Sequence, residues 1–259
     1  MRLEPKKFTR EARREVATKT AEAITARFGS QVWAIVLYGS VASGRDQAYS
    51  DVELKAVVEG IQETIYLAWV ENGLKVSVEI GELAGFLKKA KRVEDDWPLS
   101  HTEYTRFETI FGDERIGSLL REAAGKSDDK AYDAAVRELF IGNLFEYAAK
   151  SKAAYAEMNH GALVRWGFEF VNDSALMFAI AARRPYEQSA TMWEEACNLP
   201  ELPQEVERLL RRYIAGDLSK SDGLIDDLDA AWLAIADWAI RRGIHIAESA
   251  NEALEEPVL

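Results

Sequence analysis

The sequence predicts an α+β protein in which a mixed sheet with its helices is followed by a helical bundle. Three apolar runs have the length and patterning of strands, at 32–38, 51–58 and 74–80. The later part of the chain instead repeats its apolar residues at helical spacing. The residues at 125–129 are small or charged, which indicates a boundary between two domains, 1–126 and 127–259.

The other elements of the first domain follow from periodicity and from the residues that end helices. We expect a helix at 11–28, a helix or irregular crossing at 62–70, a helix at 81–93, a strand at 103–111 and a helix starting at 116. The helix at 81–93 is followed by Asp95-Asp96-Trp97-Pro98. This segment ends it, because proline cannot continue a helix and biases the residue before it away from helical conformation.

The second domain is expected to consist of helices, at 130–158, 161–182, 192–197, 206–215 and 221–242. Trp232 and Trp238 lie in the last of these at the spacing of core residues. We therefore expect them to pack in the bundle rather than stack on a ligand.

The first strand breaks into a turn that is suited to an anion. Gly39 follows the apolar run, and a glycine lets backbone N–H groups approach a ligand closely. Ser40 adds a hydroxyl, although a serine after a turn glycine is often only a turn former. A helix beginning at Val41 would direct its first N–H groups the same way, and Arg45 lies in the same loop. The turn therefore predicts a phosphate site, with Gly39, Ser40 and Arg45 as nucleotide-binding candidates.

Two carboxylates begin the next strand. Asp51 and Glu53 are two residues apart, so their side chains share one face of the strand while Val52 points into the core. Exposed strand carboxylates are common, but a pair beside a phosphate-binding turn suits Mg²⁺, which takes one or two carboxylates and fills its octahedron with phosphate oxygens and water. The pair predicts a metal site for a phosphorylated ligand.

A third acidic candidate, Glu79, has several possible roles. In the alternating run at 74–80, Lys75, Ser77 and Glu79 face either the site or solvent. Glu79 could complete a two-metal clamp for displacement at phosphorus, contact the substrate, or be an ordinary solvent-facing residue.

Together these residues resemble a known family. Gly39-Ser40, ten intervening residues and Asp51-x-Glu53 resemble the nucleotidyltransferase fold of the polymerase-beta type. The segments YGS, YSDVEL, DDWPLSH and LFEYAAK are similar, in order and spacing, to landmarks of the aminoglycoside 4'-O-nucleotidyltransferases, the kanamycin nucleotidyltransferase family. The resemblance covers nearly the whole chain. It implies Mg²⁺-dependent transfer of AMP from ATP to the 4'-hydroxyl of an aminoglycoside such as kanamycin, with release of pyrophosphate and antibiotic resistance.

The resemblance also implies roles for residues whose spacing alone indicates no function. Glu146 and Lys150 are one helical turn apart, which by itself means a surface ion pair. The LFEYAAK match implies that Glu146 is the general base and that Lys150 contacts the nucleotide phosphates. Ser50, in YSDVEL, is implied at the nucleotide, and either Asp95 or Asp96, in DDWPLSH, is a candidate for binding substrate ammonium groups. A homodimer with shared active sites is a further family trait.

The chain departs from the family pattern near its third acid. The family's acidic residue falls where this chain has Ser77, which leaves Ser77 and Glu79 as alternative substrate-binding candidates. The family's loop arginine falls slightly before Arg45, where this chain has Ser43.

Composition excludes several other classes. The net charge of −12 argues against a nucleic-acid substrate and favours a cationic one, although many acidic proteins bind no cations. No run of about eighteen apolar residues is present, so we expect no membrane span. One cysteine and no apolar signal core favour a cytoplasmic location. The rival functions are a nucleotidyltransferase that modifies a protein or RNA, such as a toxin–antitoxin component, and a nucleotide-binding module without catalysis.

Overall fold

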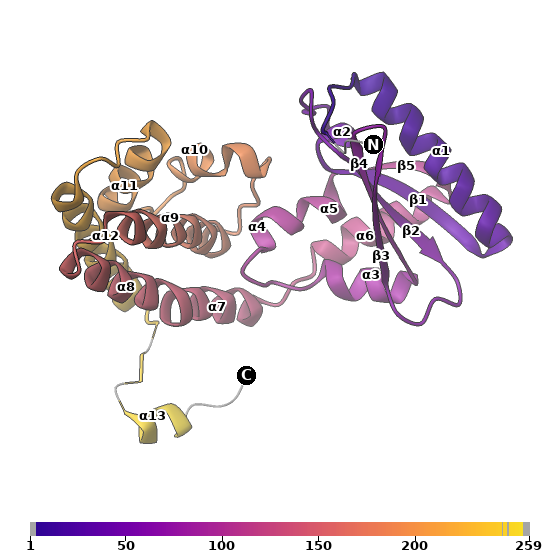
Figure 1. Ribbon diagram of the computed structural model, residues 1–259. Helices are drawn as coiled ribbons and strands as arrows, with labels where there is room; N and C mark the ends of the chain where they lie inside the picture. The colour runs from indigo at the N-terminus through magenta and orange to yellow at the C-terminus, as the bar shows by residue number, and fades with distance from the viewer. Residues whose placement is uncertain (1–3, 245, 248, 256–259) are drawn as a thin grey trace. The chain divides into compact units, whose positions relative to one another are not determined.

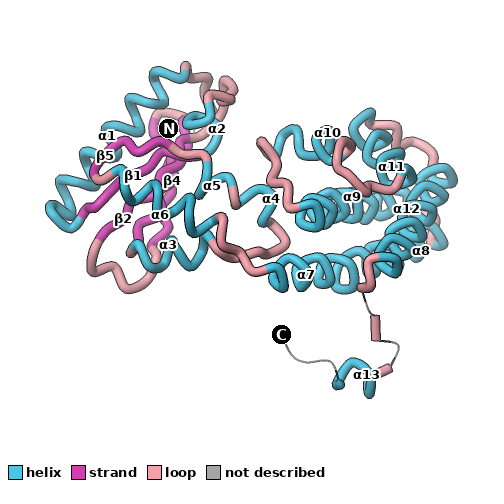
Figure 2. Tube along the Cα trace, turned by 180° about the vertical axis from the view of Figure 1, so that it is seen from behind, coloured by secondary structure: helices cyan, strands magenta, loops and turns pink. Residues whose placement is uncertain are grey.

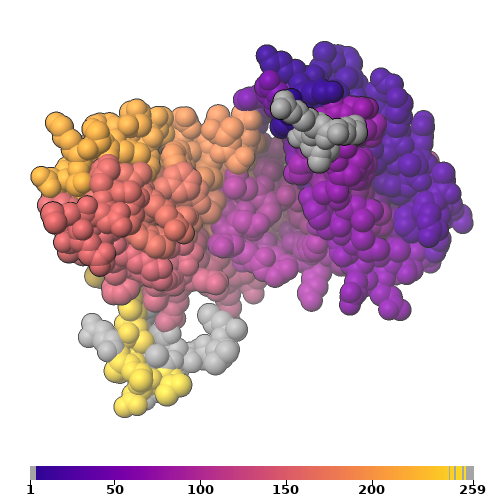
Figure 3. Space-filling view, in the orientation of Figure 1, coloured from indigo at the N-terminus to yellow at the C-terminus, as the bar shows by residue number. Residues whose placement is uncertain are grey.

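The computed structural model describes residues 4–244, 246–247 and 249–255, which Figures 1 and 3 draw in colour. It divides into two compact units. The N-terminal unit comprises the chain to Arg92 together with Ser100–Ser127, and the helical unit comprises Val93–Leu99 and the chain from Asp128. The N-terminal unit thus ends at Ser127, whereas the sequence predicted that its domain would end at residue 126. The segment Val93–Leu99 belongs to the helical unit because Trp97 is buried in that unit's core.

The N-terminal unit is built on a five-stranded sheet of order β3-β4-β2-β1-β5. Its strands are β1 Val32–Tyr38, β2 Val52–Val58, β3 Ile65–Glu71, β4 Leu74–Gly81 and β5 Glu108–Gly112. Only the β2–β4 pair is parallel, and the other three pairs are antiparallel. The predicted mixed sheet is therefore confirmed.

Helices cover the two faces of this sheet in different ways (Figure 1). The helix α1, Arg10–Phe28, packs on the face to which Val52 and Leu54 of β2 point. The helices α3, Leu83–Ala90, and α6, Glu114–Ala124, pack on the other face with Val57. Because side chains alternate along a strand, Glu53 lies on this second face, beyond the part that α3 and α6 cover.

Two expectations for this unit were wrong. The segment 62–70 contains the strand β3 rather than a helix or an irregular crossing, because Asn72 and Gly73 both have positive φ, +52° and +94°, as a tight hairpin turn requires. The segment 103–111 is divided between the short helix α5, Thr102–Thr105, and β5. Tyr104 is a strand former, but it is buried between the sheet and the covering helices, and this tertiary contact outweighs its propensity.

The helical unit contains no strand in its described residues (Figure 2). Its main helices are α7 Asp129–Arg137, α8 Phe145–Ala156, α9 His160–Ala182, α10 Met192–Ala196, α11 Gln204–Ala215 and α12 Ser221–Arg241. The remaining short α-helices are α2, Gly39–Ser43, in the N-terminal unit, and α4, Trp97–Ser100, and α13, Ala250–Glu255. The helix α9 is central, with buried residues from Leu163 to Ile180. Trp238 is buried in this core and Trp232 packs against it, as expected.

The expected single helix at 130–158 is interrupted. Between α7 and α8 the chain forms a π-helical segment, Glu138–Leu144, which buries Leu139, Phe140 and Leu144. Across the described residues, no helix has both the length and the apolarity that crossing a membrane demands.

Candidate functional site

The predicted turn lies directly against one of the predicted acids. Gly39 follows β1 with φ of +73° and begins the one-turn helix α2. A Cβ atom added to Gly39 would lie 2.1 Å from Oε2 of Glu53. The strand register agrees, because Tyr38 of β1 pairs with Glu53 of β2. Both the backbone conformation and the space therefore require glycine here, and the structure brings Gly39, Ser40 and Glu53 together.

The two acids form a like-charged pair at the start of β2. Asp51 accepts a hydrogen bond of 2.8 Å from Lys75 of β4, and this ion pair is partly exposed. Burial, with the negative charges of Asp51 and Glu103, raises the pKa of the half-buried Glu53 to about 7. A carboxylate with a pKa so far above its usual range is characteristic of functional sites.

The two carboxylates suit a hard divalent cation that also binds ligands other than protein side chains. Asp51 and Glu53 offer carboxylate oxygens, which Mg²⁺ prefers. Among the described residues, no group of three or more His, Cys, Asp or Glu is placed to hold a metal. The pair therefore suits an ion that completes its coordination with phosphate oxygens and water, rather than one enclosed by protein ligands.

The third acidic candidate lies one residue pair further along the strands. In the parallel β2–β4 register, Ser77 lies beside Glu53 and Glu79 lies beside Lys55. Glu79 accepts hydrogen bonds from Lys55 at 2.7 Å and Lys89 at 3.1 Å. The structure thus brings the buried Ser77, rather than Glu79, next to the acid pair, and it gives Glu79 two lysine partners.

Lys55 itself escaped the sequence analysis. It is 1% exposed, although lysine is rarely buried, and it pairs with both Glu79 and Glu103 at 2.7 Å. Its ammonium group lies 4.1 Å from the ring centre of Tyr38 and 5.0 Å from that of Tyr104. A lysine inside an otherwise apolar strand, two residues after Glu53, was the available signal.

Arg13 of α1 is a second residue that the sequence analysis missed. Its buried guanidinium group donates hydrogen bonds to Asp46 and to the carbonyl oxygens of Gln47 and Ser50. The Ser50 hydroxyl accepts from the N–H of Gln47, and Arg45 is exposed. Arg13 therefore fixes the loop that joins the turn to Asp51. No local pattern indicates which arginine of α1 faces this loop.

The remaining predicted residues lie in the helical unit. Glu146 and Lys150 are in α8 and form an ion pair of 2.5 Å. Lys150 also lies 4.2 Å from the ring centre of Trp166, which stacks on Tyr147 at 6.0 Å. The π-helical segment ends immediately before this turn of α8, and π-helical insertions are frequent at functional sites.

Negative charge gathers around Tyr147 in the same unit. Burial chiefly raises the pKa of Tyr147, with contributions from Asp173, Glu169, Glu146 and Asp95. Burial also raises the pKa of Asp173, which accepts a hydrogen bond of 2.8 Å from Asn143 of the π-helical segment. The predicted residues Asp95 and Glu146 therefore share one acidic environment. Asp173 went unnoticed because no local pattern sets it apart from the other polar residues of α9.

The chain is similar to proteins of known activity. The KNTase C-terminal domain family matches residues 115–245. The chain is 27% identical over 236 residues to an aminoglycoside nucleotidyltransferase (4') of Staphylococcus aureus. The aligned residues cover 91% of this chain and 93% of the relative. An aminoglycoside nucleotidyltransferase (4') of a Bacillus species gives the same values.

A solved structure is also similar. A nucleotidyltransferase-like protein of Exiguobacterium sibiricum superposes with a TM-score of 0.50 and 14% sequence identity, over 93% of this chain and 84% of that chain. At this identity the likeness is one of fold, and it supports the α+β assignment.

Replacing Gly39 by Ala is expected to destabilise the protein more than replacing Gly216 by Ala. Both positions have positive φ, +73° and +69°, so each substitution costs about 1–2 kcal/mol of backbone strain. Only at Gly39 does the new methyl group collide with Glu53, because nothing lies within 4 Å at Gly216. Urea unfolding of both variants measures the difference. Equal losses would show that the turn does not touch the carboxylate.

Replacing Glu53 by Gln is expected to stabilise the metal-free protein above about pH 7, by about 1–3 kcal/mol. Because the pKa of Glu53 is raised in the folded state, stability that is present below its ordinary value of 4.5 is lost as the pH rises through about 7. Glutamine has no such charge. Unfolding in EDTA at about pH 5 and about pH 8 measures the change, with the exposed Glu63→Gln as control. A gain of the same size at both pH values would contradict the shifted pKa.

Proposed function

The chain belongs to the family of the KNTase C-terminal domain, and from that premise we propose that it is an aminoglycoside nucleotidyltransferase. It transfers AMP from ATP to the 4'-hydroxyl of an aminoglycoside such as kanamycin, and the modification confers resistance. The curated relatives named aminoglycoside nucleotidyltransferase (4') support this activity. The observation that carries the proposal is the contact of Gly39 with the Glu53 carboxylate, since it joins a phosphate-binding turn to a metal-binding acid.

The N-terminal unit binds and orients the nucleotide. Asp51 and Glu53 would hold Mg²⁺, which when bound would supply neutralising charge for the α-phosphate and the departing pyrophosphate. Ser40 and the N–H groups of the turn orient the β- and γ-phosphates. Arg13 maintains the loop, with Ser50, between the turn and Asp51. Such positioning and charge neutralisation provide most of the acceleration in phosphoryl-type transfers.

The helical unit supplies the acid–base chemistry. Glu146 accepts the proton of the 4'-hydroxyl, whose oxygen attacks the α-phosphorus in line. A new oxygen–phosphorus bond forms as the bond to the pyrophosphate oxygen breaks, and pyrophosphate leaves with its electron pair. The partly exposed Glu146 is accessible to a sugar, and its partner Lys150 carries the charge that a phosphate attracts.

The acidic environment of the helical unit supports a polycationic acceptor. Asp95, Glu169 and Asp173 all contribute negative charge around Tyr147. Ammonium groups of an aminoglycoside would be attracted to this region, as they would to a chain of net charge −12.

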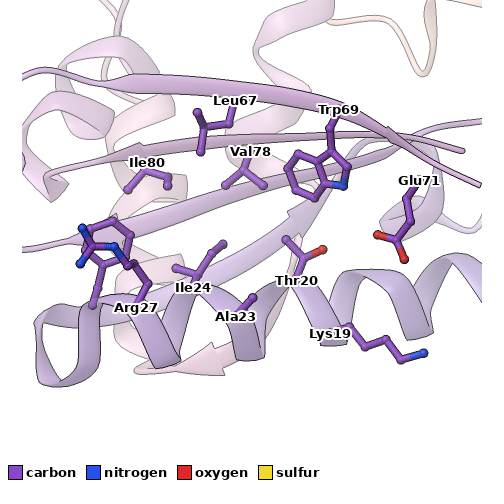
Figure 4. A pocket seen from close by; sticks show the side chains of 11 residues that line it. Lys19, Thr20, Ala23, Ile24, Arg27, Leu67, Trp69, Glu71, Val78 and Ile80 are labelled. Atoms are coloured by element: carbon purple, nitrogen blue, oxygen red, sulfur yellow. The ribbon is translucent and has the colours of Figure 1, made fainter.

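We further propose a homodimer, which the edge strand β3 supports. Every residue of β3 is exposed, including five large apolar side chains, Ile65, Tyr66, Leu67, Trp69 and Val70. An uncovered apolar edge strand favours pairing with another strand. Beside it lies an apolar groove of about 320 Å³ between α1 and β3, with Arg27 and Glu71 at opposite ends (Figure 4).

The charges at the ends of this groove favour a second copy of the chain as the partner. Antiparallel pairing of β3 with its copy about Ala68 brings Glu71 of each strand beside Ile65 of the other. Ile65 pairs with Ile80, at the end of the groove where Arg27 lies (Figure 4). The pairing therefore places the Glu71 carboxylate of each chain near Arg27 of the other chain.

The variants Asp51→Asn and Glu146→Gln are each expected to lose at least about a hundredfold in kcat, as metal-binding and general-base roles require. Pyrophosphate release from ATP with kanamycin as acceptor measures the loss. Glu157→Gln, an exposed substitution at the end of α8, is the control and should retain wild-type turnover. Near-normal turnover of Glu146→Gln would contradict the assignment of Glu146 as general base. Pyrophosphate release only with protein or RNA acceptors would show that the substrate is not an aminoglycoside.

Mixing the two inactive variants is expected to restore activity if the dimer shares its sites. A mixed dimer then has one site with both Asp51 and Glu146 intact, so random pairing restores about a quarter of wild-type activity. Co-expression with two different affinity tags isolates the mixed dimer. An inactive mixed dimer would show that each site is built from one chain.

A further inference from the structure

The geometry points to Asp173 of α9 as a positioning residue for Glu146, which it reaches through Asn143 of the π-helical segment. This role rests on the proposed nucleotidyl transfer, in which Glu146 is the general base. Asp173 holds the helical turn that precedes Glu146, and thereby sets the direction in which the base projects from α8.

The rotation of α8 depends on the π-helical segment that precedes it. At the end of this segment the N–H of Phe145 donates to the carbonyl oxygen of Phe140, five residues earlier, whereas an α-helix uses the carbonyl four residues earlier. The extra residue in the turn changes which side chains of α8 face α9, compared with an uninterrupted helix. The presentation of Glu146 therefore depends on the contacts that hold this turn in its π-helical form.

A directional contact holds the turn against α9. The amide of Asn143 donates a hydrogen bond of 2.8 Å to one carboxylate oxygen of Asp173, and the amide of Asn172 donates one of 3.3 Å to the other. A hydrogen bond fixes the rotation of a helix more closely than apolar burial does, because burial is non-directional. Asn143 precedes Glu146 by three residues, so the anchored amide and the base are neighbours on the helix surface.

A second contact between the same helices lies about two turns away. The ammonium group of Lys150 lies 4.2 Å from the ring centre of Trp166 in α9. Lys150 follows Asn143 by seven residues and Trp166 precedes Asp173 by seven, so the two contacts match along antiparallel helices. Glu146 lies between them in sequence and pairs with Lys150 at 2.5 Å. Loss of the first contact would therefore leave Glu146 held from one side only.

The burial of Asp173 argues against a role in stability alone. Its side chain is 9% exposed, and burial raises its pKa although both amide hydrogen bonds oppose the shift. Apart from Asp173 and Ser174, the buried residues of α9 are apolar or glycine. An apolar residue would fill this position without desolvating a charge. The carboxylate therefore contributes the direction of a hydrogen bond rather than stability.

The first test compares Asn143→Ala with Tyr186→Phe in the full chain. Asn143→Ala leaves Asp173 bonded to Asn172, and we expect kcat to fall at least about tenfold while KM for ATP changes less than about twofold. Tyr186→Phe removes a buried hydrogen bond of 2.6 Å to the carbonyl oxygen of Ala175 in the same helix. It should lower the free energy of unfolding and leave kcat unchanged. Pyrophosphate release with ATP and kanamycin measures kcat and KM, and urea unfolding measures stability.

A near-normal kcat in folded Asn143→Ala, or an equal loss of kcat in Tyr186→Phe, would overturn the positioning role. Either result would show that the hydrogen bond of Asn143 contributes to stability alone or that any loss of packing around α9 slows the reaction.

Two double variants test whether Asp173 acts through Asn143 and Glu146. Asn143→Asp combined with Asp173→Asn exchanges donor and acceptor, and it should recover kcat to within about threefold of wild type. In a Glu146→Gln background, Asn143→Ala should cost less than about twofold more, because no base remains to be positioned.

No recovery in the exchange variant, or a further loss of about tenfold in the Glu146→Gln background, would contradict the role of Asp173. If the exchange variant does not fold, the Glu146→Gln background decides. A wild-type protein that releases no pyrophosphate with any aminoglycoside would instead refute the proposed function.

Discussion

The contact between Gly39 and the carboxylate of Glu53 is the constraint on which the candidate site depends. A side chain at position 39 would occupy the place of the carboxylate, and the positive φ of Gly39 turns the chain from β1 into α2 at that point. The turn and the acid are thus fixed to each other through the paired strands β1 and β2. Arg13 then fixes the loop between them from α1. A nucleotide whose phosphates also bind a metal would find the turn and the Glu53 carboxylate already in position.

This arrangement carries an electrostatic cost. Glu53 is half-buried beside Asp51, and its pKa is raised to about 7 because the ionised form is desolvated and repelled. Lys55 and Lys75 oppose that shift without cancelling it. A site that concentrates negative charge in this way is stabilised by a bound cation, so the fold gives up some stability for binding capacity.

The turn and the acid pair were predictable because they depend on local rules. Gly39-Ser40 ends an apolar run, and Asp51 and Glu53 share a strand face whatever the tertiary structure. The partners of Lys55 and Arg13 were not predictable, because they lie far along the chain: Glu103 is 48 residues from Lys55, and Ser50 is 37 residues from Arg13. The strand β3 was misread although Asn72-Gly73 carries a hairpin signal, since its exposed apolar residues show no alternation. The assignment of Glu146 came from family resemblance, and its spacing to Lys150 indicates only the ion pair that the structure contains.

The most direct test of the central claim is a crystal structure with Mn²⁺ and a non-hydrolysable ATP analogue, in which anomalous scattering locates the metal. The account predicts an anomalous peak bonded to a carboxylate oxygen of Asp51 and to one of Glu53, with the phosphates of the analogue against Gly39 and Ser40. A nucleotide bound elsewhere, or a metal that contacts neither acid, would contradict it.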